Sequence, residues 1–198
     1  MAPRTPLLRP KAYYERFDSP SLEIAVLAVG ANAVALVAVL WWFLTAVAAR
    51  VEGPSAGLGD AMGAVVPSVL VSVVLGWLLL AAILHLVVRY AGGDGDVWTT
   101  LAVVGETNLV SLAMMPGMVA VFYLLLGDVP ADPEAAAAFF ERTLGRSQVE
   151  FHAVSLVTTV WSAVILGYGF EAGHDLAGGT AFAIAAGYAV INLVFLLA

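Results

Sequence analysis

Cysteine is absent from this sequence of 198 residues, and lysine occurs only once, at Lys11. Without cysteine the chain forms no disulfide, no thiolate metal site and no cysteine nucleophile. Charged residues make up only 12% of the sequence and hydrophobic residues 62%, whereas a typical soluble domain is roughly 25% charged. The chain has too few charged residues to cover the surface of a soluble domain. The composition therefore predicts a membrane-embedded protein.

Basic residues are also scarce, and the formal net charge is -7. Nucleic-acid binding needs a basic surface that neutralises phosphates, so we expect no nucleic acid as a partner. His85, His152 and His174 are scattered without an HExxH motif, and the sequence contains no Gly-x-Ser-x-Gly motif. We therefore expect no catalytic residues, no metal site and no cofactor, and we predict that the protein is not an enzyme.

Long apolar runs predict the fold, because a membrane-spanning helix needs about 20 mainly apolar residues. Five runs meet this length, over residues 24–49, 61–90, 97–126, 149–170 and 176–198. The third run contains Pro116 and Gly117, and a proline inside a helix removes a backbone hydrogen bond. The predicted fold is therefore all-α: a polytopic bundle of five transmembrane helices, with the third kinked or interrupted near Pro116.

The arginine and lysine residues predict the orientation of the bundle, since cytoplasmic loops carry an excess of both. With a cytoplasmic N-terminus, five basic residues lie inside and three outside. The inside set is Arg4, Arg9, Lys11, Arg16 and Arg89, and the outside set is Arg50, Arg142 and Arg146. We predict a multi-pass protein of the cell membrane, with a cytoplasmic N-terminal segment over residues 1–21, a membrane domain over residues 22–198 and the C-terminus outside.

The loop between the third and fourth spans, ADPEAAAAFFERTLGRSQ, predicts a short helix outside the membrane. Asp132 is a suitable N-cap, and Pro133 suits the first turn. Phe139 and Phe140 leave two alternatives open. The helix either lies against the bilayer surface or is an ordinary loop helix.

The stretch HLVVRYAGGDGDVWTTLAVVGE, residues 85–106, joins the second and third spans. Gly92, Gly93 and Gly95 predict a tight turn, because glycine readily adopts positive φ. Asp96 is a suitable N-cap for the third span. The stretch lacks the Gly-Lys-Ser/Thr of a phosphate loop and the alternating oxygen ligands of a calcium loop, so we expect neither site.

Polar residues gather on both sides of this turn, and we predict that His85, Arg89, Glu106, Thr107 and Asn108 form a functional cluster. His85 and Arg89 are four residues apart and share one helix face. In the antiparallel hairpin Glu106 lies deeper than His85 by roughly 6 Å. Arg89 either approaches Glu106 or extends toward the lipid headgroups.

Glu106 is the most informative of these residues, because a carboxylate inside a span costs several kcal/mol unless it is protonated, paired or in contact with water. Two interpretations stay open. In the structural one, protonated Glu106 or Asn108 hydrogen-bonds a neighbouring helix. In the functional one, Glu106 handles an ion, a proton or a ligand.

Three features together resemble the Yip1 family in its short prokaryotic form. They are the basic and aromatic segment RPKAYYERF, the five spans, and a helix that ends in Arg89 before Gly92-Gly93-Asp94-Gly95 and Thr100-Leu101-Ala102-Val103-Val104-Gly105. The resemblance implies a five-helix integral membrane protein with a cytoplasmic N-terminus. Eukaryotic relatives of this kind take part in vesicle traffic and bind small GTPases.

The chain departs from those relatives in two ways. It lacks their Asp-Leu-Tyr-Gly-Pro motif, and it has Glu106-Thr107-Asn108 where many relatives have an aromatic residue and then a proline. Small-GTPase binding is therefore not expected. The resemblance favours a protein that organises lipids or membrane proteins in the bilayer, with other membrane proteins or further copies of itself as partners. The alternative is a channel or transporter for a small ion or solute that uses the polar cluster around Glu106.

Overall fold

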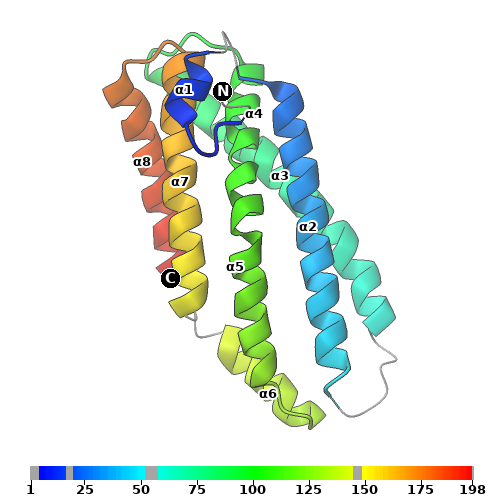
Figure 1. The fold of residues 1–198 in the computed structure, drawn as a ribbon. Coiled ribbons are helices and arrows are strands. Elements are labelled where there is room, and N and C mark those ends of the chain that lie inside the picture. Colours follow the sequence, from blue (N-terminus) through cyan, green and yellow to red (C-terminus); the bar gives the residue numbers. More distant parts are fainter. Residues whose placement is uncertain (1–4, 17–19, 52–57, 145–148, 198) are drawn as a thin grey trace.

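A computed structural model describes residues 5–16, 20–51, 58–144 and 149–197 of the chain (Figure 1). Every regular element in these ranges is a helix, which confirms the all-α prediction. The helices are α1 (Pro10–Tyr14), α2 (Leu22–Ala48), α3 (Leu58–Tyr90), α4 (Val97–Glu106), α5 (Asn108–Gly127), α6 (Pro133–Leu144), α7 (Val149–Gly173) and α8 (Gly178–Leu197).

Five segments are long and apolar enough to cross a membrane, as the sequence predicted. They are Leu22–Ala48, Gly63–Tyr90, Val97–Gly127, Val149–Gly173 and Gly178–Leu196. The chain is therefore a multi-pass membrane protein. Its predicted boundaries agree with the helices to within a few residues.

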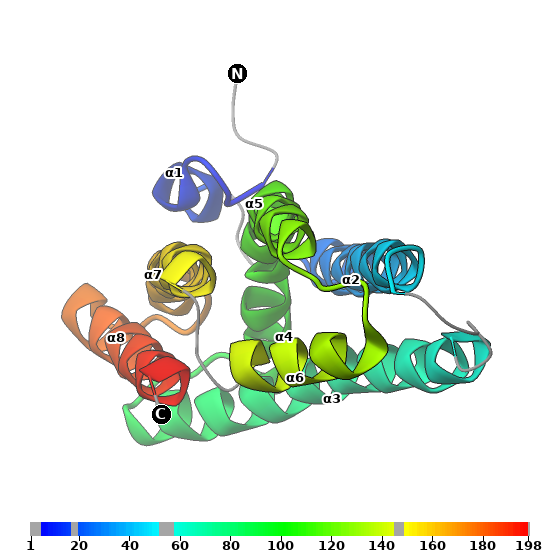
Figure 2. The same ribbon diagram turned by 90° about the horizontal axis from the view of Figure 1, so that it is seen from below.

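The two short helices lie at opposite ends of the bundle (Figures 1 and 2). We call the end that carries α1 and the turn after α3 the N-terminal end, and the end that carries α6 the far end. Helix α2 packs against α3, α4 and α5, while α8 packs mainly on α7. Helix α1 packs on α7, so the N-terminal segment is part of the folded bundle.

The third span consists of two helices, α4 and α5, separated at Thr107. The hydroxyl of Thr107 donates to the carbonyl oxygen of Val104 at 2.7 Å, and Nδ2 of Asn108 donates to the carbonyl oxygen of Gly105 at 3.1 Å. These bonds satisfy the polar side-chain groups of Thr107 and Asn108 inside the bundle, as their burial requires.

The sequence predicted the interruption at Pro116 and Gly117 instead. Both residues lie inside α5, which the structure assigns as one helix from Asn108 to Gly127. The interruption occurs nine residues earlier because Thr107 and Asn108 carry polar groups that replace helical hydrogen bonds.

The turn between α3 and α4 uses its glycines for two different reasons. Gly92 has a φ of 92°, which favours glycine. Gly95 is required for close approach, since a Cβ there would lie 2.4 Å from the carbonyl oxygen of Gly173 and 2.5 Å from Nδ1 of His174. The expectation of positive φ thus holds at Gly92 and is wrong for Gly93 and Gly95.

The two predicted N-caps are confirmed. Asp96 Oδ1 accepts from the backbone N–H of Thr99 at 2.8 Å, and Asp132 Oδ1 accepts from that of Ala135 at 2.8 Å.

The aromatic side chains of α6 pack on the protein at the far end. Phe139 and Phe140 lie against a cluster that includes Phe43 and Leu125. The rings of Phe140 and Phe43 meet edge to face, with centroids 6.2 Å apart. These contacts favour the ordinary loop helix over a helix lying on the bilayer surface.

Candidate functional site

Glu106 is the last residue of α4, and it is fully buried at 0% exposure. The hydroxyl of Tyr13 donates to its Oε1 at 2.8 Å, and the hydroxyl of Tyr14 donates to its Oε2 at 2.6 Å. The backbone N–H of Ser21, the N-cap of α2, donates to Oε1 at 3.3 Å. Donors of the chain itself thus take the place of water around this carboxyl group, as burial of such a group requires.

The two tyrosines reach Glu106 because α1 lies on α7 and its rings are buried. Tyr13 and Tyr14 form a core cluster with Val110 and Ile165, and the tyrosine rings meet edge to face at 5.0 Å. Gly169 on α7 leaves room for this arrangement, since a Cβ there would lie 3.2 Å from Cζ of Tyr14. The apolar contacts and the hydrogen bonds therefore hold α1 in the same position.

Burial raises the pKa of Tyr13 and of Tyr14 well above the usual range, and the Glu106 carboxyl group adds to the shift through its charge and its hydrogen bonds. Both phenols therefore stay protonated at any physiological pH. They act as fixed donors to Glu106 and not as acids or bases.

A second contact holds the residues before α1. Nε1 of Trp161, on α7, donates to the carbonyl oxygen of Leu7 at 2.7 Å. The outer side of the segment is exposed, including Leu8 at 83% exposure, Arg9 and Lys11. The N-terminal segment is thus anchored on its inner side and offers apolar and basic side chains on its outer side.

The five residues of the predicted polar cluster do not form one site. His85 Nδ1 lies 2.9 Å from the hydroxyl of Thr100, and Arg89 donates to the carbonyl oxygen of Gly93 at 3.0 Å. Within the described residues, neither one hydrogen-bonds Glu106. Tyr13 and Tyr14 are the hydrogen-bond partners of Glu106, while His85 and Arg89 have these hydrogen-bond partners within their own hairpin.

Thr107 and Asn108 lie next to Glu106 in the chain but serve other contacts. Thr107 bonds to the carbonyl of Val104, as described above. Asn108 Oδ1 accepts from Nδ2 of Asn32 on α2 at 2.9 Å. This contact between α5 and α2 agrees with the structural one of the two interpretations that the sequence left open.

Two of the three histidines, which appear scattered in the sequence, lie close together. His174 Nε2 is 3.0 Å from the hydroxyl of Thr100, so Thr100 connects His174 to His85. His174 is fully buried, and burial together with the nearby His85 lowers its pKa. In the part of the chain that the structure describes, no three histidine, aspartate and glutamate side chains converge as metal ligands.

Sequence reasoning missed Tyr13 and Tyr14 as the partners of Glu106. The adjacent tyrosines of RPKAYYERF were a usable signal, because a carboxyl group inside a span needs hydrogen-bond donors and a phenol supplies one. What the sequence did not show is that the segment before the first span packs against the third and fourth spans.

Comparison with known proteins gives one match. The family model described as Yip1 domain matches residues 5–198. No curated protein and no solved structure matches the chain. The matched range includes Tyr13, Tyr14 and Glu106, so all three residues of this contact lie within the Yip1 domain.

Proposed function

Because this chain belongs to the Yip1 family of integral membrane proteins, we propose that it is non-enzymatic and organises membrane proteins or lipids through helix–helix and loop contacts. The observation that carries the proposal is the contact of Tyr13 and Tyr14 with Glu106. It holds the N-terminal segment on the bundle with Leu8, Arg9 and Lys11 on the outside. A fixed surface of this kind suits recognition, because a segment that is already ordered loses less conformational entropy when it binds a partner.

The N-terminal segment, residues 1–21, is proposed to lie on the cytoplasmic side of the cell membrane and the C-terminus outside. Arg9, Lys11 and Arg16, in or next to α1, lie at the same end of the bundle as Arg89 at the end of α3, whereas Arg50 follows α2 and Arg142 is in α6 at the far end. The excess of basic residues at the N-terminal end supports this orientation.

The alternative function is a channel or transporter for a small ion or solute that uses the cluster around Glu106. It has less support, because Glu106 is fully buried and both of its oxygens accept hydrogen bonds from the chain itself. A transport role at this carboxyl group would need the N-terminal segment to move away.

Affinity purification of the tagged full chain from its native membranes in mild detergent, with mass spectrometry of what is retained, tests the proposal. We expect a stoichiometric partner that survives washing with salt. The double variant Arg9→Ala/Lys11→Ala, which changes only exposed side chains of the outer surface, should lower the recovery of that partner. Glu141→Ala, an exposed change on α6 at the far end, serves as the matched control.

Two results would count against the organising role. One is recovery of the chain alone from native membranes. The other is an ion flux in liposomes that contain the purified protein and that Glu106→Gln abolishes, which would favour the transport alternative.

A further inference from the structure

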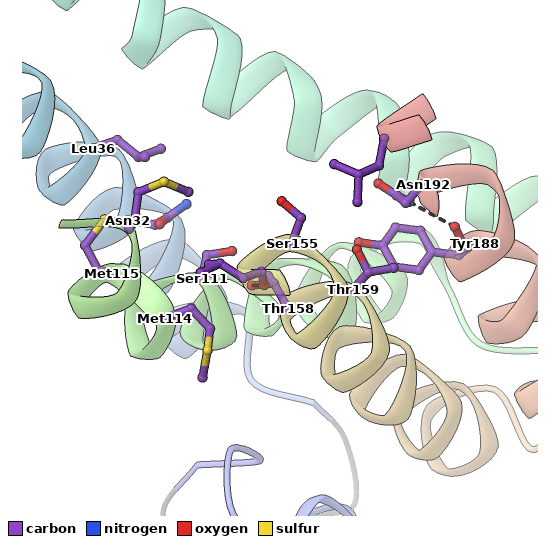
Figure 3. Close-up of a pocket in the computed structure, with 13 residues that line it drawn as sticks. Asn32, Leu36, Ser111, Met114, Met115, Ser155, Thr158, Thr159, Tyr188 and Asn192 are labelled. Atoms are coloured by element: carbon purple, nitrogen blue, oxygen red, sulfur yellow. Dashed lines mark hydrogen bonds between the residues drawn. The ribbon is translucent and has the colours of Figure 1, made fainter. Parts of the chain in front are cut away.

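A cavity of about 350 Å³ lies between α2, α5, α7 and α8, away from the Glu106 site (Figure 3). Asn32 lies ten residues after the start of α2, and Thr159 lies ten residues after the start of α7. At 1.5 Å per residue each is roughly 15 Å from its end of the bundle, about half of the hydrocarbon thickness. The cavity therefore reaches the middle of the bilayer, and Leu196 places its other end near the end of α8.

The lining of this cavity combines two kinds of uncharged side chain. The polar ones are Asn32, Ser111, Ser155, Thr158, Thr159, Tyr188 and Asn192, and the apolar ones are Leu36, Met114, Met115, Met118, Val154 and Leu196. Figure 3 shows the hydroxyl groups of Ser111 and Ser155 facing the space between the labelled side chains. A cavity of this size, with a mainly hydrophobic wall and a few polar groups, is typical of sites for small molecules.

One residue of the wall, Asn32, has a buried side-chain oxygen that accepts no hydrogen bond from the described part of the chain. The carbonyl of Gly105 accepts from Asn108, so Asn108 must turn its Nδ2 toward Gly105 and its Oδ1 toward Asn32. Asn32 must then present its Nδ2 to Asn108. Its own Oδ1 is left buried and without a partner in the described part of the chain. Asn32 is only 5% exposed, and a buried acceptor without a donor destabilises the folded state.

We propose that this cavity binds an uncharged amphiphile that bears hydroxyl groups, such as a neutral lipid of the monoacylglycerol type. The ligand is uncharged because no lining residue carries a charge to pair with an ion at this depth. It bears hydroxyl groups because the serine and threonine hydroxyls of the wall both donate and accept hydrogen bonds. It has an apolar part because Met114, Met115 and Met118 provide a flexible apolar wall.

The same hydroxyl chemistry is found in a membrane lipid and in a water-soluble polyol. The apolar part of the wall and its position in the bilayer favour the lipid. This inference does not depend on the proposed function, because the cavity and the outer surface of α1 share no residue.

Native mass spectrometry of the purified full chain in detergent tests the proposal with four probes. Monoolein carries a chain and two hydroxyl groups, methyl oleate carries the same chain without a hydroxyl, oleate carries it with a charge, and glycerol carries hydroxyls without a chain. We expect one monoolein per chain, bound at least about tenfold more tightly than methyl oleate or oleate. Glycerol that displaces monoolein and binds with equal affinity would overturn the assignment to a lipid.

Variants locate the site. Ser155→Leu places a larger apolar side chain in the cavity and should weaken monoolein binding by about tenfold or more. Thr159→Val keeps the side-chain shape and removes one hydroxyl, so it should fold normally and weaken binding by about threefold or more. Ser68→Leu, an exposed change on α3, should leave binding within about twofold. Equal binding of monoolein and methyl oleate, or full binding by both cavity variants, would overturn the proposal.

Discussion

Two polar regions of the bundle are built in opposite ways. Around Glu106 both carboxyl oxygens are bonded to donors of the chain, and the residues leave no exposed surface. Around Asn32 the polar groups line a cavity of about 350 Å³, and the buried oxygen of Asn32 accepts no hydrogen bond from the residues that the structure describes. A fully bonded polar group rigidifies a fold, whereas an incompletely bonded one beside a cavity is suited to a ligand. We therefore propose a structural role for the first region and ligand binding for the second.

The largest expected effect is that of Glu106→Leu. It leaves the hydroxyls of Tyr13 and Tyr14 and the N–H of Ser21 without their acceptor, so the free energy of unfolding should fall by about 4 kcal/mol. Denaturant titration in detergent measures this change. Glu106→Gln keeps one acceptor oxygen and should lose less while still folding. Glu141→Leu, an exposed change on α6, should alter stability by less than about 0.5 kcal/mol.

If Glu106→Gln lowered the free energy of unfolding as much as Glu106→Leu does, the predicted order of the two variants would be wrong. It would show that the negative charge of Glu106, and not its acceptor oxygens, is required for the fold.

Tyr14→Phe should have the next largest effect. It removes the hydrogen bond of 2.6 Å to Glu106 and keeps the ring in its packed position, so the expected loss is about 2 kcal/mol. The same titration measures it, with Tyr123→Phe, at an exposed residue of α5, as the matched control. The double variant Tyr14→Phe/Glu106→Leu should be less destabilising than the sum of the two changes, because the residues share one interaction.

A smaller effect is expected from pH at His174. Burial and His85 lower the pKa of His174 in the folded chain, while the nearby Asp96 and Asp94 oppose the shift. The unfolded chain therefore binds the proton more readily, and stability should decrease as the pH falls below about 6.5, the usual value for histidine. Unfolding midpoints at pH 7.5 and 5.5 check this. His174→Gln should reduce the decrease, whereas His152→Gln, at the far end, should retain it.

The smallest effect is expected in the cavity. Ser155→Ala removes a hydroxyl from the cavity wall, and without added ligand it should change the free energy of unfolding by less than about 0.5 kcal/mol. Calorimetry in lipid-free detergent measures this. A loss as large as that of Tyr14→Phe would remove the distinction between the two regions.

Local patterns in the sequence predicted most of the fold. The five spans follow from apolar length, and Asp96 and Asp132 act as N-caps through contacts three residues away. The sequence predicted a kink or an interruption at Pro116, and the structure excludes the interruption, because Pro116 lies inside one helix from Asn108 to Gly127. The decisive groups are the side chains of Thr107 and Asn108, which bond to nearby carbonyls.

The candidate site was predictable only in part. A carboxyl group inside a span had to find partners, and the sequence identified Glu106 as the residue to explain. Its partners lie far away in the chain, with Tyr13 separated from it by 93 positions. The contact between His85 and His174 through Thr100 is also long-range. Such pairings depend on how the helices pack, which periodicity within one helix does not report.

The central claim is that Glu106 holds the N-terminal segment on the membrane domain, and a distance between two spin labels tests it most directly. The chain contains no cysteine, so labels at Lys11→Cys and Tyr90→Cys, both exposed positions, attach only there. We predict a narrow distance distribution in lipid bilayers with Glu106 intact and with the control Glu141→Leu, and a broad one with Glu106→Leu. An equally narrow distribution with Glu106→Leu would contradict the claim.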